Sequence, residues 1–97
     1  MEMSLMLTVT LHDTSLLHAR PASIIAVTAK GYESVVMLSA DTQIADAKNP
    51  LSLMRLHYPL GTPLELLADG PDEAAALEAV ADAIHTALGG TFSSSAS

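Results

Sequence analysis

Apolar and polar residues alternate near the N-terminus of the chain, and this period of two predicts a β-strand from Leu5 to about His12. A turn-forming segment follows, and then Pro21 opens a run in which apolar residues recur at helical spacing. We therefore predict a helix that closes at Lys30 and Gly31. The core face predicted for this helix consists of Ala22, Ile25, Ala26 and Ala29.

The middle of the chain predicts several short elements. The β-branched and apolar stretch from Val35 to Ala40, a turn, and the shorter stretch from Gln43 to Asp46 indicate a β-hairpin. Asn49 followed by proline is typical of a helix start, so we predict a short helix from Pro50 to Leu56. Alternation resumes from Leu64 to Ala68 and indicates a fourth strand.

The last third of the chain predicts one longer helix, from about Pro71 to Leu88, because apolar residues form a stripe down one face. Asp72 and Glu73 lie at its start, where acidic side chains complement the helix dipole. The stripe consists of Leu77, Val80, Ala81, Ile84 and Leu88. Residues 91–97 include four serines and one large apolar residue, which predicts a disordered tail after a domain of residues 1–90.

The predicted order of elements is β-α-β-β-α-β-α, and an α+β two-layer sandwich accounts for it most simply. A sheet with helices on one face buries both the alternating strands and the striped helices. Several families share this order, among them ferredoxin-like regulatory modules, so the fold class alone does not determine the function.

Composition narrows the class of protein. With 97 residues, the chain has material for one domain around one core. It contains no cysteine, which excludes disulfides and thiolate metal sites and favours the cytoplasm. A formal net charge of −7 disfavours nucleic acids and acidic membrane surfaces as partners. The first residues carry no basic side chain and are interrupted by polar ones, so we expect neither a signal peptide nor a membrane span.

The segment that carries chemistry is Leu17 to Ser23, in which His18 and Arg20 stand before and at the start of a predicted helix. A helix N-terminus presents unpaired backbone amides and the positive end of the dipole, which together attract an anion such as phosphate. The guanidinium of Arg20 binds phosphate oxygens in bidentate fashion. The imidazole of His18 is a nucleophile near neutral pH, so we predict a phosphohistidine. None of the other histidines has metal-ligand spacing, and we expect no metal site.

The sequence Leu-His-Ala-Arg-Pro-Ala resembles the active-site motif of the HPr family, the histidine-containing phosphocarriers of the phosphoenolpyruvate-dependent phosphotransferase system. Later landmarks also resemble that family, namely Ala47-Lys48, Gly61-Thr62 and the segment from Asp69 to Ala74. The resemblance extends from about Leu5 to Leu88. It implies an open-faced sandwich in which a four-stranded antiparallel sheet carries three helices on one face.

The resemblance also implies a function. His18 stands where the family is phosphorylated on a ring nitrogen, Arg20 where it has its phosphate-binding arginine, and Ala19 and Arg20 offer backbone amides there. Enzyme I is then the expected donor, enzyme IIA-type domains of the sugar phosphotransferase system are the expected acceptors, and no cofactor is needed. We expect a cytoplasmic monomer that carries a covalent phosphoryl group rather than a stand-alone enzyme.

The resemblance places partner docking on the start of the first helix and on the short second helix. Pro50, Leu51 and Met54 are the expected apolar contacts, and Lys48 and Arg55 contribute to a positive rim together with the phosphate-binding arginine. Because helical stripes usually face a core, burial of the leucine and the methionine is the alternative.

The chain departs from the family pattern at three positions. Asn49 stands where Gram-positive relatives have a regulatory serine, and it has no hydroxyl for a kinase to phosphorylate. Leu16 and His57 replace common glycines in loops. Two further functions stay open at this point: a regulatory relay of the nitrogen-branch type, which uses the same chemistry, and a ferredoxin-like ligand-binding module.

Overall fold

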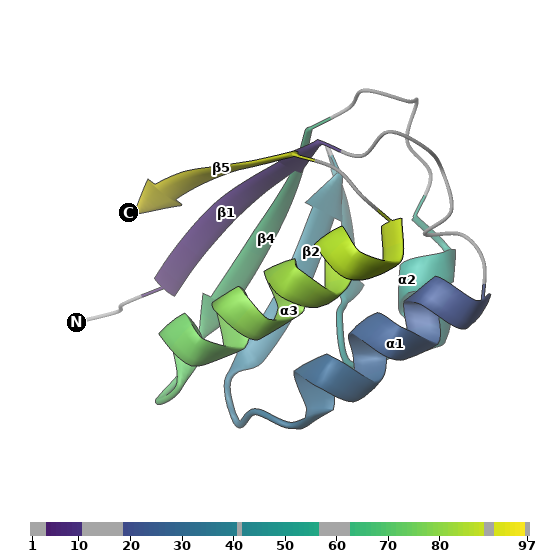
Figure 1. The fold of residues 1–97 in the computed structure, drawn as a ribbon, viewed down its shortest axis with the longest axis horizontal. Coiled ribbons are helices and arrows are strands. Elements are labelled where there is room, and N and C mark those ends of the chain that lie inside the picture. The colour runs from purple at the N-terminus through teal and green to yellow at the C-terminus, as the bar shows by residue number, and fades with distance from the viewer. Residues whose placement is uncertain (1–3, 11–18, 41, 57–62, 89–90, 97) are drawn as a thin grey trace.

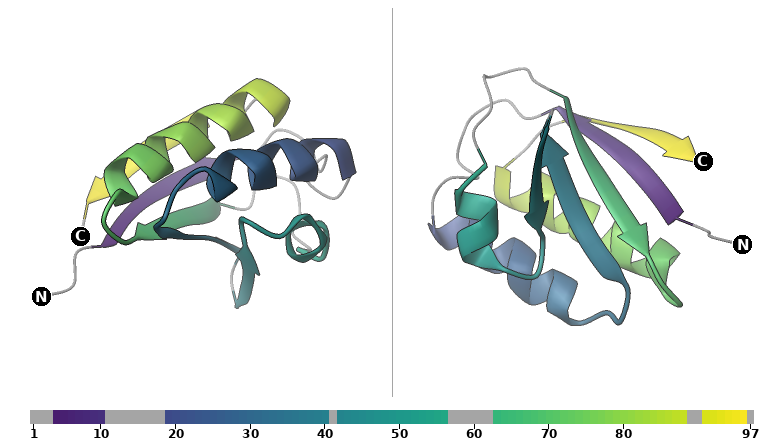
Figure 2. Two further views of the ribbon diagram at one scale, coloured as in Figure 1. Left: turned by 90° about the horizontal axis from the view of Figure 1, so that it is seen from below. Right: turned by 180° about the vertical axis from the view of Figure 1, so that it is seen from behind.

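Eight elements make up the fold in the computed structural model, which describes residues 4–10, 19–40, 42–56, 63–88 and 91–96. They are β1 (Ser4–Thr10), α1 (Ala19–Lys30), β2 (Val35–Ala40), β3 (Gln43–Asp46), α2 (Pro50–Met54), β4 (Pro63–Asp69), α3 (Glu73–Leu88) and β5 (Thr91–Ala96). The strands form one antiparallel sheet in the order β3-β2-β4-β1-β5. Helices α1 and α3 lie over the same face of this sheet (Figures 1 and 2), which confirms an α+β sandwich with three helices.

The register of the central strands explains the period of two in the sequence. Leu66 of β4 lies opposite Leu7 of β1 on one side and opposite Leu38 of β2 on the other. In β2 and β4 every second residue is buried, and the residues between them are half-buried or exposed. One face of the sheet therefore belongs to the core, and the other remains open.

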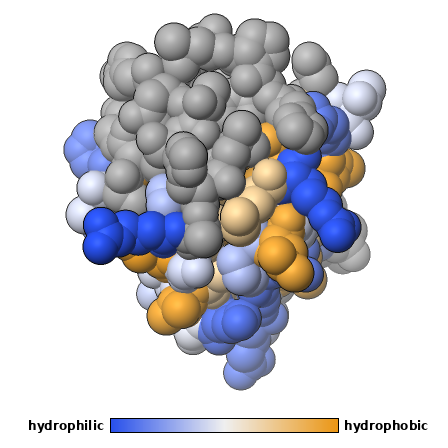
Figure 3. All heavy atoms as spheres, turned by 90° about the vertical axis from the view of Figure 1, so that its right-hand side faces the viewer, coloured by the Kyte–Doolittle hydropathy of each residue, from blue (hydrophilic) through white to orange (hydrophobic). Residues whose placement is uncertain are grey.

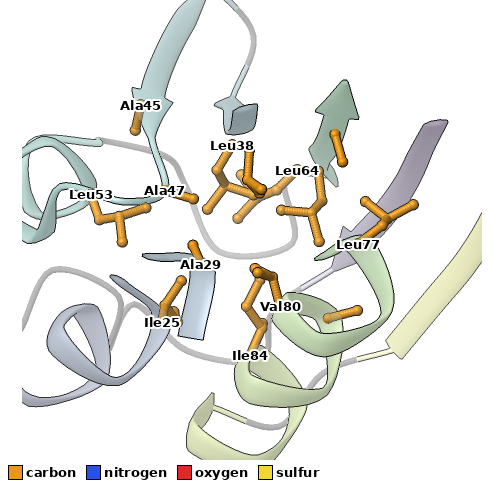
Figure 4. Packing of buried hydrophobic residues seen from close by; sticks show 14 of the residues in the cluster. Ile25, Ala29, Leu38, Ala45, Ala47, Leu53, Leu64, Leu77, Val80 and Ile84 are labelled. Atoms are coloured by element: carbon orange, nitrogen blue, oxygen red, sulfur yellow. The ribbon is translucent and has the colours of Figure 1, made fainter. Parts of the chain in front are cut away.

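The core lies between the sheet and the helices, where side chains from both layers point toward one another (Figure 4). The predicted face of α1 is confirmed, since its four residues are at most 1% exposed. The stripe of α3 is confirmed for its described members, Leu77, Val80, Ala81 and Ile84, which are all buried. Each large aliphatic side chain buried in this way contributes about 1.5–3 kcal/mol relative to an exposed one.

The C-terminal segment differs from the prediction of a disordered tail. Residues Thr91–Ala96 form β5, which pairs with β1 from Thr10 opposite Thr91 to Leu5 opposite Ala96. The sheet thus has five strands rather than the predicted four, and the division at residue 90 does not set a tail apart. The physical reason is that an edge strand offers a row of unpaired N–H and C=O groups, which pair with backbone of almost any composition.

Helix boundaries also shift from their predicted positions. Helix α1 begins at Ala19 rather than at Pro21, so the proline lies inside the first turn. Helix α2 ends at Met54, with Arg55 as its C-cap, two residues before the predicted end. Helix α3 begins at Glu73, because the two preceding residues form a turn. Placing each helix start at a proline located both long helices, but the predicted start of α1 was two residues too late and that of α3 two residues too early.

Hydrogen bonds tie two loops together at the end of the molecule where α1 finishes and α3 begins. The Asp72 carboxylate accepts hydrogen bonds from the backbone N–H groups of Glu33 and Ser34, at 3.0 and 2.9 Å, and from the Ser34 hydroxyl. The Asp72 N–H donates in turn to Ser34 Oγ at 3.1 Å. Gly70 permits this approach, because a Cβ there would lie 2.6 Å from Ser34 Cα. These bonds lower the pKa of Asp72 below its ordinary value, the hydroxyl of Ser34 having the largest effect.

Candidate phosphoryl-transfer site

The first turn of α1 contains Ala19 and Arg20 as its opening residues. The first four N–H groups of an α-helix have no carbonyl partner within the helix, so the amides of both residues are available to an external acceptor. Pro21 follows as the third residue, where its missing N–H removes only a donor that the helix itself would leave unused. The local sequence therefore builds a helix start of the kind that favours a bound anion.

Arg20 lies on this first turn with an exposed side chain. The first turn contains no acidic residue, although the positive end of a helix dipole favours acidic side chains and disfavours cations. The arginine therefore does not help the helix to form. Its guanidinium instead adds permanent positive charge to a helix start whose first amides have no carbonyl partner within the helix, and this combination favours a bound anion with several oxygens.

His18, the predicted phosphoacceptor, directly precedes α1 but lies outside the described residues, as do Leu16, His57, Gly61 and Thr62. Its assignment stays a prediction from the motif. Among the other predicted site residues, Ala19 has a described backbone, whereas Arg20 and the docking residues have described side chains as well.

An exposed stripe along α1 leads away from Arg20 and was not predicted. Ile24 is 44% exposed and Val27 is 70% exposed, four and seven residues after the arginine and hence on the same side of the helix. The sequence contained a signal for this stripe, because the predicted core face of α1 leaves these two apolar residues pointing outward. Large aliphatic side chains grouped on an exposed face favour contact with a partner protein.

Helix α2 packs beside α1 and extends this surface. Leu51 is 63% exposed, which favours the predicted docking role over burial, whereas Leu53 is the residue that α2 buries in the core. The Asn49 side chain caps the helix by accepting from the N–H groups of Leu51, at 3.0 Å, and of Ser52, at 3.4 Å. Asn49, which has no hydroxyl for a kinase to phosphorylate, is thus the N-cap of α2.

The remaining docking residues are placed differently from one another. Arg55 is exposed at the end of α2, Pro50 is half-buried, and Met54 is half-buried and packs against the core. Figure 3 views the end of the molecule where α1 begins and α2 lies, and it shows apolar side chains between strongly hydrophilic ones. Arg20, Ile24 and Val27 of α1 and Leu51 and Arg55 of α2 are all exposed. These five residues are hereafter called the docking surface, because partner docking on them is proposed.

Lys48, predicted to contribute to the positive rim, is placed apart from Arg20. Its Nζ donates a hydrogen bond to the carbonyl oxygen of Tyr32 at 2.8 Å, two residues beyond the last residue of α1. Arg20 lies at the other end of that helix, roughly 15 Å away at 1.5 Å per residue. The structure therefore separates the two cations that the sequence grouped together.

Two further features are absent from the described part of the chain. No group of three or more histidine or acidic side chains there is arranged to hold a metal ion. Within the same residues, no helix is long and apolar enough to cross a membrane.

The fold and the site together define a small α+β protein with an exposed arginine at a helix start and exposed apolar side chains on the same helix. Comparison with known proteins identifies the family, since residues 6–86 match the family described as the PTS HPr component phosphorylation site. The chain belongs to the HPr family, the phosphocarriers of the phosphotransferase system. This result confirms the resemblance and does not favour a ligand-binding module or a separate regulatory relay.

Individual relatives agree with the family. Phosphocarrier protein HPr of Treponema pallidum is 43% identical over 63 residues, which cover 65% of this chain and 72% of that protein. The multiphosphoryl transfer protein of Vibrio cholerae is 37% identical over 76 residues, 75% of this chain and 19% of that protein. The solved structure of the Mycoplasma histidine-containing phosphocarrier protein matches with a TM-score of 0.78 and 30% identity, covering 86% of this chain and 96% of that one.

Proposed function

We propose that this phosphocarrier accepts a phosphoryl group on His18 from phosphorylated enzyme I and donates it to enzyme IIA-type domains of the sugar phosphotransferase system. The observation that carries the proposal is Arg20, an exposed cation in the first turn of α1 where helix physics favours an acidic residue. It stands two positions after the histidine, within the part of the chain that matches the family's phosphorylation site.

The proposed transfer is a displacement at phosphorus. A bond forms between a ring nitrogen of His18 and the phosphorus atom, while the bond from phosphorus to the donor breaks and its electron pair leaves with the donor. The charge on the phosphoryl oxygens is then shared between the Arg20 guanidinium and the backbone amides of Ala19 and Arg20. In the onward transfer a nucleophile of the acceptor bonds to phosphorus, and the bond from phosphorus to His18 breaks with its electron pair returning to the ring nitrogen. The carrier itself needs neither a metal nor a cofactor for these steps.

The docking surface supports partners with an acidic, partly apolar face. Val27 and Leu51 offer exposed aliphatic contact, and Arg20 and Arg55 add positive charge to a protein whose formal net charge is −7. An acidic groove is attracted to this surface and repelled by the rest of the carrier, which orients the encounter. We further propose that the carrier acts as a cytoplasmic monomer, because one copy supplies both the site and the surface.

The proposed function is tested by incubating the purified protein with phosphoenolpyruvate and enzyme I, followed by mass spectrometry under mild conditions. We expect one acid-labile phosphoryl group on the wild-type chain and none on His18→Ala. A wild-type chain that stays unmodified, or a His18→Ala variant that is labelled equally, overturns the proposal.

A matched pair of arginine variants separates phosphate binding from docking. Arg20→Ala is expected to slow transfer at saturating carrier, because the phosphoryl group loses its bidentate donor. Arg55→Ala removes another exposed cation and is expected to raise KM with little change in kcat, since it affects only the encounter. Equal effects of the two variants on kcat would contradict the special role of Arg20.

A further inference from the structure

The side chain of Lys48 joins two parts of the chain that are distant in sequence. It lies between β3 and α2 and is half-buried, and its Nζ donates to the Tyr32 carbonyl oxygen at 2.8 Å. Tyr32 follows the last turn of α1 and packs against the core. This hydrogen bond therefore ties the segment that enters α2 to the segment that leaves α1.

Other hydrogen bonds of this segment close its turn and anchor it to β2. Asp46 Oδ1 accepts from the Lys48 N–H at 3.0 Å, and the Asp46 N–H donates to Ser52 Oγ at 3.0 Å. Ala47 is buried, and its N–H donates to the carbonyl of Val36 at 2.9 Å. The turn is thus closed upon itself and anchored to β2, while Lys48 supplies a side-chain link to the end of α1.

Helix α2 depends on such links for its position. It contains five residues, and a helix of this length is not stable on its own because nucleation outweighs the few hydrogen bonds formed. Leu53 holds its inner face in the core, and Leu51 is its large exposed apolar side chain. A change in how the chain enters α2 therefore changes the direction in which Leu51 is displayed.

We infer that Lys48 is a positioning residue that sets the orientation of α2, and with it the docking surface, instead of contacting partners as a positive charge. The inference rests on the proposed function, because it takes α2 to be part of the surface that enzyme I contacts. It distinguishes Lys48 from Arg55, which is exposed at the far end of the same helix.

The test compares Lys48→Met with Lys30→Met, which removes one exposed positive charge from the last turn of α1. Initial rates of transfer from phosphorylated enzyme I are measured against carrier concentration at low and high salt, and hydrogen exchange is followed in the α2 amides. Lys48→Met is expected to raise KM about fivefold at both salt concentrations, with kcat unchanged and faster exchange in α2. Lys48→Arg, which keeps the charge and a donor, is expected to recover part of the lost affinity.

Lys30→Met is expected to leave exchange in α2 unchanged, and any effect on KM is expected to disappear at high salt, as it does for a screened surface charge. The inference is overturned if Lys48→Met behaves in the same way, or if neither KM nor exchange responds to it. If the wild-type chain accepts no phosphoryl group, the proposed function fails, whereas hydrogen exchange in α2 still decides whether Lys48 holds that helix.

Discussion

The two ends of α1 use polar and charged side chains in opposite ways. At its C-terminal end, the Asp72 carboxylate accepts hydrogen bonds from two backbone amides and a hydroxyl, and Ser34 is only 1% exposed. At its N-terminal end, Arg20 is exposed in a first turn that contains no acidic residue, and Ile24 is exposed on the same side.

The difference distinguishes groups that stabilise the fold from groups that are left for a partner. A polar group whose hydrogen bonds are completed inside the protein contributes to stability, and its loss leaves a buried partner unsatisfied. A cation at the positive end of a helix, beside exposed apolar side chains, contributes little to folding. Substitutions where Ser34, Gly70 and Asp72 connect two loops should therefore reduce the free energy of unfolding. Substitutions on the docking surface should instead reduce the rate of phosphoryl transfer.

Gly70→Ala is expected to have the largest effect on stability. Gly70 has a φ of 153°, which side-chain-bearing residues rarely adopt, and the added Cβ would lie 2.6 Å from Ser34 Cα. Backbone strain and overpacking together predict a loss of about 2–4 kcal/mol, measured by urea unfolding. Gly31→Ala is the control, because its Cβ would lie 3.3 Å from a single carbonyl oxygen. An equal loss of stability in both variants would contradict the special role of the close contact between Gly70 and Ser34.

Asp72→Asn is expected to have the next largest effect, and the effect should depend on pH. Hydrogen bonds in the folded state lower the pKa of Asp72 below 3.8, so the stability that this carboxylate contributes is complete above that pH. This contribution is lost as the pH falls through the lower folded-state pKa. Unfolding free energies of wild type and variant should therefore differ near neutral pH and converge in acid.

Asp82→Asn provides the comparison for Asp72→Asn, because Asp82 is an exposed carboxylate on α3, the helix that follows Asp72. We expect its unfolding free energy to stay within about 0.5 kcal/mol of wild type. If Asp72→Asn changes stability no more than this control does, the hydrogen bonds to the loop of Ser34 do not hold the two loops together.

Val27→Thr is expected to have the smallest effect on stability and a clear effect on transfer. The side chains are nearly equal in shape, and Val27 is 70% exposed, so unfolding should change by less than about 0.5 kcal/mol. A hydroxyl in an apolar contact should raise KM with phosphorylated enzyme I about three- to fivefold. Val35→Thr is the control, because Val35 is 56% exposed at the start of β2 and outside the docking surface. Equal KM values for the Val27 and Val35 variants would show that enzyme I does not contact the docking surface at Val27.

Patterns within single segments predicted much of the fold. The alternation in β2 and β4 and the apolar faces of α1 and α3 are confirmed, because one-sided burial imposes a period that side chains record directly. The start of α1 was predicted two residues too late, and residues 91–96 form β5 where a disordered tail was predicted. The start of α1 depends on the backbone geometry around Pro21, and the pairing of β5 depends on the unpaired edge of β1. Neither property produces a periodic pattern in the sequence.

The sequence by itself determined which chemistry is proposed for this protein. Its motif places Arg20 directly at a helix start, and side-chain type, spacing and the helix dipole are local properties that need no tertiary contact. Only the tertiary structure decided which cations and apolar residues share a surface. Lys48 is close in sequence to α2 and hydrogen-bonds at the far end of α1, while Val27 and Leu51 are distant in sequence and are exposed on two helices that pack together. The packing of α2 against α1 and β3, and not proximity along the chain, determines which of these residues a partner meets.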